Sequence, residues 1–364
     1  MAKPHANLED ELKMLISQSG PMTMAQYMGN CLSHPKYGYY MNKDPFGVEG
    51  DFTTAPEVSQ MFGEMLGMWI ANTWQAMDSS AAIQLIELGP GRGTLMADIL
   101  RVLNIVPALK EKLSVHMVEM SETLTQAQQA NLKQESELNI KWHKSLNDVP
   151  KGTAFIIANE FFDALPAHQF EYNSEGWCER MMGLEGDKLT PCLSAPTSAL
   201  FMCDEALRNN AKPADILEVS PLSITIMGDI SRRIKDHGGA ALIIDYGYLK
   251  SAYGDSLQAL KNHAHCSPFE NAGHADITTH VNFEILSKCA SELGLDVFGA
   301  TSQGEFLGQM GIAMRAEKLS ANATEKQKDD IKAAIKRLTG SDEMGTLFKV
   351  MAVSTGQPKP IGFD

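Results

Sequence analysis

The sequence lacks several features that would assign it to a specialised class of protein. No apolar run approaches the roughly 18 residues that a membrane-spanning helix needs, and the best runs, 155–158 and 240–244, have the length of a strand. The six cysteines form no CxxC pair and show no metal-ligand spacing, which is typical of reduced cytosolic thiols. These shortages argue against a membrane protein and a disulfide-rich secreted domain.

Basic residues are also scarce. The 364 residues include 31 Lys and Arg against 45 Asp and Glu, a net charge of −14, so we expect no nucleic-acid partner, because phosphate neutralisation supplies most of such affinity. An acidic protein favours cationic partners instead. Acids appear by Glu9 to Glu11, unlike a mitochondrial presequence. We therefore expect a cytoplasmic protein of a prokaryote, with a mature organellar form as the alternative, and no membrane insertion.

A metal site is not expected either. The ten histidines form no HxxxH or HxH pair with a nearby acid. His263 and His265 come closest, but they lie in a loop without matched ligands.

The hydrophobic pattern changes once along the chain. Up to about residue 80 it predicts helices at 8–18, 23–32 and 57–74, whereas from residue 83 apolar strands alternate with helices. Such strands predict a parallel sheet covered on both faces, a doubly wound α/β fold. The predicted strands are 83–88, 115–120, 155–159, 241–246, 296–300 and 347–354. We expect an N-terminal helical, substrate-side region at 1–80 and a domain at 81–364.

Two stretches interrupt this alternation and are interpreted as insertions, at about 167–215 and 250–285. In the first, alternating residues on both sides of Ser174 to Gly176 predict a β-hairpin.

The sharpest motif follows the strand 83–88 and opens a helix. Its glycines allow a tight turn and a close approach to a ligand. A dinucleotide fingerprint would need Gly or Ala at position 94, where this chain has Thr94. The motif instead resembles the first motif of class I S-adenosylmethionine (AdoMet) methyltransferases, although a tight turn without a ligand stays open. Its residues are Glu87, Gly89, Pro90, Gly91 and Gly93.

A carboxylate ends the next strand. Glu119 stands where a carboxylate can accept both ribose hydroxyls of a nucleoside lying across the strand ends. The alternative is a solvated charge at the end of a strand. The glycine loop and the Glu119 carboxylate could bind either NAD or AdoMet. The absence of a glycine at position 94 favours AdoMet.

The segment after the strand 155–159 carries the candidate catalytic residues. Asn159, Glu160 and Asp163 surround two phenylalanines at the end of a parallel strand, which faces the ligand crevice of such sheets. In many N-methyltransferases, a polar residue followed by aromatics grips the accepting nitrogen here. The structural alternative is that the acids cap turns while the phenylalanines pack in the core.

Six ordered blocks make the resemblance specific. From about Met24 to Phe283 the chain resembles the MidA family of AdoMet-dependent protein arginine methyltransferases, whose mitochondrial members are assembly factors for respiratory complex I. The blocks are GDFTTAPEVSQMFGEMLG, ELGPGRGTLMADIL, VHMVEMS, ANEFFDALPAHQF, ALIIDYGY and HADITTHVNF.

The resemblance implies a class I methyltransferase Rossmann-like sheet with an N-terminal helical addition. It also implies AdoMet as the cofactor, bound on Gly89–Gly93 and Glu119, and a protein substrate, with an arginine in a respiratory complex subunit as the expected acceptor. Within the matching block 51–54 we expect Thr53 to lie in a strap over donor or acceptor. Asp245 and His280 could reach the acceptor channel, or Asp245 could bond neighbouring amides and His280 could be structural.

For an arginine acceptor, carboxylates solve a chemical problem. The guanidinium stays protonated and its charge is delocalised, so its nitrogens are poor nucleophiles. A carboxylate that bonds the guanidinium holds one nitrogen at the methyl group. We expect Glu160 in this role first and Asp163 second. A methyltransferase for a small molecule or another side chain, and an AdoMet-binding assembly chaperone, remain alternatives, and the sequence leaves the oligomeric state open.

Overall fold

The computed structural model describes residues 7–42, 54–77, 82–135, 137–200, 202–356 and 358–363. These residues divide into two compact units. The hairpin unit comprises the described residues of Met1–Phe52, Asp163–Thr225 and Lys250–His280. The sheet unit comprises those of Thr53–Phe162, Ile226–Leu249 and Val281–Asp364.

A mostly parallel sheet forms the centre of the sheet unit, in the order β15-β16-β10-β5-β2-β3-β4, with β14 beside β10. β16 runs antiparallel to both of its neighbours. The doubly wound α/β fold is therefore confirmed. The strands are β2 (Ile83–Leu88), β3 (Leu113–Val118), β4 (Asn139–His143), β5 (Ala154–Asn159), β10 (Gly239–Tyr248), β14 (Val281–Asn282), β15 (Asp296–Ser302) and β16 (Phe348–Ser354).

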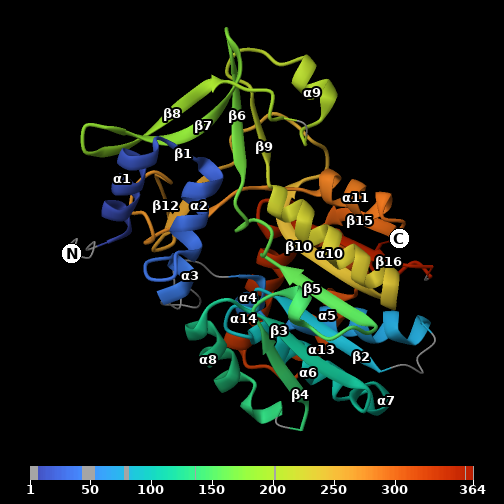
Figure 1. Ribbon diagram of the computed structural model, residues 1–364. Helices are drawn as coiled ribbons and strands as arrows, with labels where there is room; N and C mark the ends of the chain where they lie inside the picture. Colours follow the sequence, from blue (N-terminus) through green and yellow to red (C-terminus); the bar gives the residue numbers. More distant parts are fainter. Residues whose placement is uncertain are drawn as a thin grey trace. The chain divides into compact units, whose positions relative to one another are not determined.

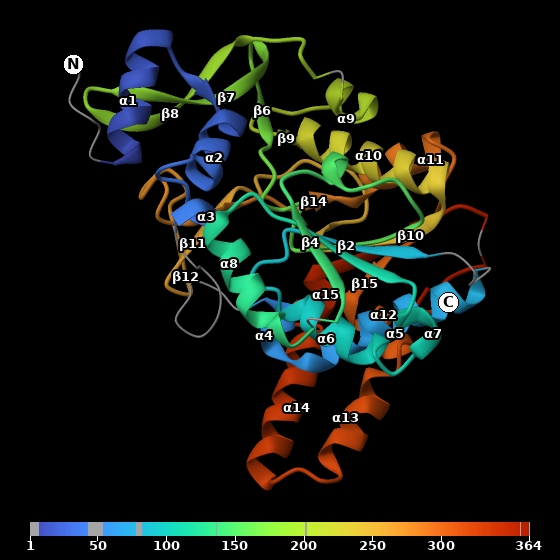
Figure 2. The same cartoon turned by 60° about the horizontal axis from the view of Figure 1, so that its bottom comes forward.

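Helices cover both faces of this sheet (Figure 1). One core joins the apolar side chains of β2, β5, β10 and β16 to α5, α6, α12 and α15, while α10 and α11 lie on the opposite face. Figure 2 shows α13 and α14 as a pair of adjacent helices. The helices are α4 (Ala55–Val58), α5 (Gln60–Ala76), α6 (Thr94–Leu103), α7 (Pro107–Lys110), α8 (Glu122–Asn131), α10 (Pro221–His237), α11 (Phe283–Glu292), α12 (Gln303–Gln309), α13 (Ile312–Ser320), α14 (Glu325–Thr339) and α15 (Met344–Leu347).

The hairpin unit is built on antiparallel strands. The predicted hairpin is confirmed, because β6 and β7 pair from Phe170↔Glu179 to Asn173↔Gly176, and β8, β1 and β9 extend the sheet. The region 250–280 adds a small sheet of three strands. The elements are α1 (Leu8–Ser19), β1 (Met22–Thr23), α2 (Met24–Ser33), α3 (Tyr39–Asn42), β6 (His168–Asn173), β7 (Gly176–Glu185), β8 (Lys188–Pro196), α9 (Glu205–Asn209), β9 (Ile216–Val219), β11 (Gln258–Lys261), β12 (Ala264–Cys266) and β13 (Asp276–Thr278).

The helix expected over 57–74 differs from the structure, which has two helices there. Ser59 interrupts them with extended backbone, φ −166° and ψ 138°, and its hydroxyl accepts a hydrogen bond from the Met61 amide. This is an N-cap, which satisfies an amide that the helix itself leaves unpaired. The break separates the short α4 from α5.

The boundary expected between residues 80 and 81 stays a prediction. The division into units groups α5 with the sheet, and groups the described part of 1–52 with the two stretches interpreted as insertions. Among the described residues, no helix combines the length and apolar character needed to cross a membrane.

Close strand packing generates a stability prediction. A Cβ at Gly247 would lie 2.0 Å from the Val281 carbonyl oxygen, where β10 pairs with β14. We expect Gly247→Ala to lower the free energy of unfolding by about 1–3 kcal/mol, because a backbone atom must shift. Gly308→Ala is the matched control, since that Cβ would meet no atom within 4 Å. Urea unfolding of both variants measures the difference, and equal stabilities would contradict this account of the strand pairing.

Candidate active site

The glycine loop between β2 and α6 needs glycine for two reasons. Gly89, Gly91 and Gly93 have φ of +60°, +52° and +78°, a left-handed conformation that disfavours side chains. A Cβ at Gly89 would also lie only 2.8 Å from the Phe161 ring. The loop closes with a hydrogen bond from the Gly93 amide to the Pro90 carbonyl, 2.7 Å. Its backbone therefore lies directly against the segment that follows β5.

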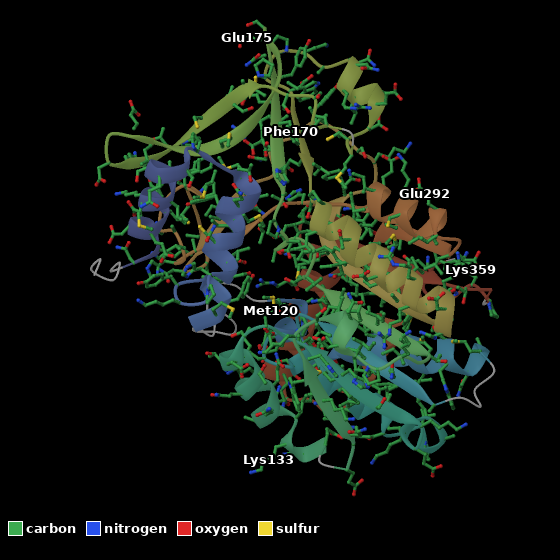
Figure 3. All side chains as sticks on the ribbon, viewed as in Figure 1. Met120, Lys133, Phe170, Glu175, Glu292 and Lys359 are labelled. Atoms are coloured by element: carbon green, nitrogen blue, oxygen red, sulfur yellow. The ribbon has the colours of Figure 1, made fainter. Side chains whose placement is uncertain are left out.

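Glu119 is a fixed, buried carboxylate one residue beyond β3. It is 8% exposed, and it accepts hydrogen bonds from the Ser121 amide at 2.7 Å and from Gln128 Nε2 at 3.2 Å. Burial raises the pKa of Glu119, whereas these two hydrogen bonds lower it. Its neighbour Met120 is 59% exposed and is labelled in Figure 3, so the chain reaches the surface immediately after this carboxylate.

Glu87 is buried at the end of β2. Burial, followed by the negative charge of Glu119, raises the pKa of Glu87 well above its ordinary value. Its Oε2 atom is buried and has no hydrogen-bond partner among the residues that the structure describes. Both effects favour the protonated carboxyl group, so Glu87 retains its proton to a higher pH than an exposed glutamate does.

The segment after β5 holds a carboxylate in an unusual backbone conformation. Glu160 has φ +50°, which is uncommon for a residue with a side chain. Its amide donates to the Ile244 carbonyl at 2.9 Å, and its Oε1 accepts from the Ala55 amide at 3.0 Å and Asn159 Nδ2 at 3.2 Å. Asn159 Oδ1 is buried and has no hydrogen-bond partner within the described ranges. That atom can therefore accept a hydrogen bond from a ligand.

Asp245 bonds backbone amides, which was the structural alternative predicted for it from the sequence. It is fully buried, and its Oδ2 accepts from the amides of Phe161 at 3.1 Å and Phe162 at 2.9 Å. Its Oδ1 accepts from the Tyr246 amide at 2.9 Å. Asp245 is therefore engaged with backbone amides and fixes the segment that carries Glu160.

Two residues that the sequence did not indicate as candidates, Glu57 and Gln128, connect α4 and α8 to the glycine loop and the start of α6. Glu57 on α4 accepts a hydrogen bond from the Thr94 hydroxyl at 2.7 Å, at the start of α6. Gln128 on α8 contacts both Glu119 and the Gly91 carbonyl. Gln128 lies on the buried face of α8 with Leu124 and Thr125. A glutamine on the apolar face of a helix was the signal that could have identified it.

The candidates Asp163 and His280 belong to the hairpin unit. Asp163 is 6% exposed in the hairpin unit, where its carbonyl accepts from the Thr279 amide. In the same unit the Tyr40 hydroxyl donates to Asp276 at 2.7 Å, and the His280 amide donates to the Ser256 hydroxyl. Thr53 lies outside the described residues.

The other candidates share one edge of the sheet. Leu88 pairs with both Val118 and Ala158, so β2, β3 and β5 end at the same edge of the sheet. Asn159 pairs with Ile244, beyond which β10 continues to Tyr248. Glu87, the glycine loop, Glu119, Asn159 and Glu160 all lie at these carboxyl ends, where such sheets bind ligands.

A family model of S-adenosyl-L-methionine-dependent methyltransferases matches residues 65–301. The chain belongs to this family. Accordingly it is an AdoMet-dependent methyltransferase, and AdoMet is its cofactor, as the sequence predicted.

Relatives named as mitochondrial protein arginine methyltransferase NDUFAF7 align over most of the chain. The Bos taurus protein is 38% identical, and the alignment covers 82% of this chain and 72% of that protein. The Homo sapiens protein is 35% identical, with coverage of 93% and 81%. The Drosophila melanogaster homolog is 36% identical, with coverage of 97% and 86%. The predicted family resemblance is thereby confirmed.

Solved structures support the fold. A superfamily member from Burkholderia thailandensis, bound to S-adenosyl-homocysteine, superimposes with a TM-score of 0.84 at 25% identity, covering 98% of this chain and 93% of that chain. The native crystal structure from the same organism gives a TM-score of 0.82 at 25% identity and the same coverage. The Rossmann-like methyltransferase fold is confirmed.

The buried Glu87 generates a prediction about pH. Because its folded-state pKa is raised, the folded protein retains a proton that the unfolded chain loses above about pH 4.5. The stability that Glu87 contributes should therefore fall as pH rises above about 5, with a limiting slope of about 1.4 kcal/mol per pH unit. Glu87→Gln does not titrate and should lose less stability.

The measurement is urea unfolding at several pH values. Glu122→Gln is the control, because that carboxylate is 75% exposed. Parallel pH profiles for the wild type and Glu87→Gln would show that Glu87 is not the titrating group.

Proposed function

We propose that the protein transfers the methyl group of AdoMet to an arginine side chain of a partner protein. The observation that carries this proposal is the Glu160 carboxylate, held at the end of β5 by the Ala55 amide and Asn159. The names of the relatives, protein arginine methyltransferases at 35–38% identity, support the same substrate class. Alone, neither the fold nor the cofactor distinguishes arginine from other acceptors.

The donor site in this proposal uses Glu87, Gly89, Pro90, Gly91, Gly93 and Glu119. The left-handed glycines leave backbone accessible where side chains would intrude, and Glu119 offers carboxylate oxygens to the ribose hydroxyls. These residues fit AdoMet, since the glycine loop offers backbone without side chains and Glu119 offers a fixed hydrogen-bonding partner. Thr53, expected in a strap over the donor, stays a prediction. Bound AdoMet supplies an electrophilic methyl group on a sulfonium.

The acceptor side uses Glu160 first. A carboxylate that accepts from a guanidinium localises its charge and orients one nitrogen for attack, so positioning contributes much of the catalysis. Asn159 Oδ1 would accept a further N–H bond, since it is buried and otherwise unsatisfied among the described residues. Asp163 stays our second carboxylate for this role. A proton can leave the product nitrogen after transfer, so no strong base is required beforehand.

The cellular setting is part of the proposal. The six cysteines, all within the described residues, form no disulfide bond with one another, which suits a reducing compartment. We propose the cytoplasm, although the named relatives are mitochondrial. A subunit of a respiratory complex is our candidate partner, and mass spectrometry of a deletion strain, searched for lost methyl-arginine, would identify the acceptor.

Donor placement gives one prediction. Gly91→Val should abolish binding of S-adenosylhomocysteine while the fold persists, because valine is strained at φ +52° and fills the space of the donor. Isothermal calorimetry measures the affinity, and NAD should produce no thermal shift. Equal affinity for wild type and variant would contradict the placement, and a larger shift with NAD would favour a dehydrogenase.

Catalysis gives another prediction. Glu160→Gln should preserve AdoMet binding and lower turnover about 10²-fold or more, because the neutral amide presents donors to a substrate that also presents donors. Tritium transfer from AdoMet to the identified partner protein measures this. Glu122→Gln, an exposed carboxylate of the same unit, is the control. Unchanged turnover in both Glu160→Gln and Asp163→Asn would mean that the segment is structural.

A further inference from the structure

Gln128 is a fully buried polar side chain near the candidate donor site. It lies on α8 with an exposed fraction of 0%, whereas its neighbour Gln129 is exposed. Glutamine is mostly found at protein surfaces, and a buried amide is costly unless its donors and acceptor are satisfied. The burial of Gln128 therefore requires specific partners.

Gln128 uses both ends of its amide. Its Nε2 donates to the Gly91 carbonyl at 2.8 Å and to Glu119 Oε2 at 3.2 Å. Its Oε1 accepts from Trp142 Nε1 at 2.9 Å. A carbonyl only accepts and an indole only donates, so this arrangement permits one amide orientation. Trp142 thereby directs the two N–H bonds of Gln128 towards the glycine loop and Glu119.

The two oxygens of Glu119 are consequently fixed by different groups. The Ser121 amide bonds Oε1 and Gln128 bonds Oε2, so the carboxylate plane cannot rotate without breaking a bond. Each carboxylate oxygen can accept more than one hydrogen bond, which leaves capacity for ribose hydroxyls. Gln128 also lies against the loop itself, because a Cβ at Gly93 would be 3.4 Å from its Cγ.

We infer that Gln128 is a positioning residue for the methyl donor. It holds the Glu119 carboxylate and the Gly91 carbonyl in one fixed relation, so that the ribose and the methionine arm of AdoMet meet a single preorganised surface. The inference rests on the proposed placement of AdoMet on these residues. Preorganisation of this kind raises affinity because fewer groups must be ordered on binding.

The test replaces the amide with an apolar side chain of similar length. We expect Gln128→Met to weaken S-adenosylhomocysteine binding about tenfold or more, since it removes a hydrogen bond to a charged group and one to the loop. The KM for AdoMet should rise while kcat at saturating AdoMet and the KM for the acceptor stay near wild type. Gln129→Met on the same helix is the matched control and should bind normally.

A charge exchange gives a second, independent readout. Gln128→Glu can still accept from Trp142, but it opposes the Glu119 carboxylate and the Gly91 carbonyl, so it should bind more weakly than Gln128→Met. In the Glu119→Gln background, Gln128→Glu again places an amide opposite a carboxylate. The additional loss of affinity that Gln128→Glu causes should therefore largely disappear. Non-additivity of this kind separates positioning of Glu119 from a general loss of stability.

The outcomes distinguish a failure of the inference about Gln128 from a failure of the proposed AdoMet placement. If Gln128→Met binds S-adenosylhomocysteine as the wild type does, while Glu119→Ala binds weakly, Gln128 has no positioning role and the donor site stands. If Glu119→Ala also binds normally, the donor placement itself is wrong. If Gln128→Met fails to fold, Trp142→Phe replaces it. Trp142→Phe removes the indole donor that fixes the amide orientation of Gln128, so it should weaken S-adenosylhomocysteine binding several-fold. Unchanged affinity would overturn the inference.

Discussion

A buried carboxylate in β10, three residues before the end of that strand, organises the candidate active site. Asp245 accepts hydrogen bonds from the amides of Phe161, Phe162 and Tyr246, and such bonds to a charged group are stronger than those between neutral groups. β10 also pairs with β5 as far as Ile244 and Asn159. Strand pairing therefore determines where β5 ends, and Asp245 determines how the chain leaves it.

The donor side is arranged by the same physical means. A buried side chain, Gln128, bonds the glycine-loop backbone just as Asp245 bonds the backbone after β5. The two backbone segments then meet, since the Phe161 ring leaves no room for a Cβ at Gly89. Interior packing is dense and transmits small shifts, so a change in either segment alters the other.

The elements that could be predicted from sequence are those with local signals. Apolar runs identified β2, β5, β10 and β16, and glycine spacing identified the loop before α6. β4 carries no apolar run, because its exposed and half-buried residues alternate at the edge of the sheet. The break at Ser59 was missed because apolar residues keep helical spacing on both sides of it. The sequence allowed Asp245 to bond amides, but its Phe161 partner lies 84 residues away, and the Gly91 partner of Gln128 lies 37 residues away. No local pattern identifies these partners.

The backbone of Glu160 adopts a conformation that is costly for a residue with a side chain. A φ of +50° is nearly free of cost for glycine, whereas a side chain there strains the fold by about 1 kcal/mol. Glycine at 160 would relieve this strain, but the Ala55 amide and Asn159 would lose the carboxylate to which they donate. The strain and the two hydrogen bonds therefore act in opposite directions on stability, and stabilisation of this enzyme by design should leave residue 160 untouched.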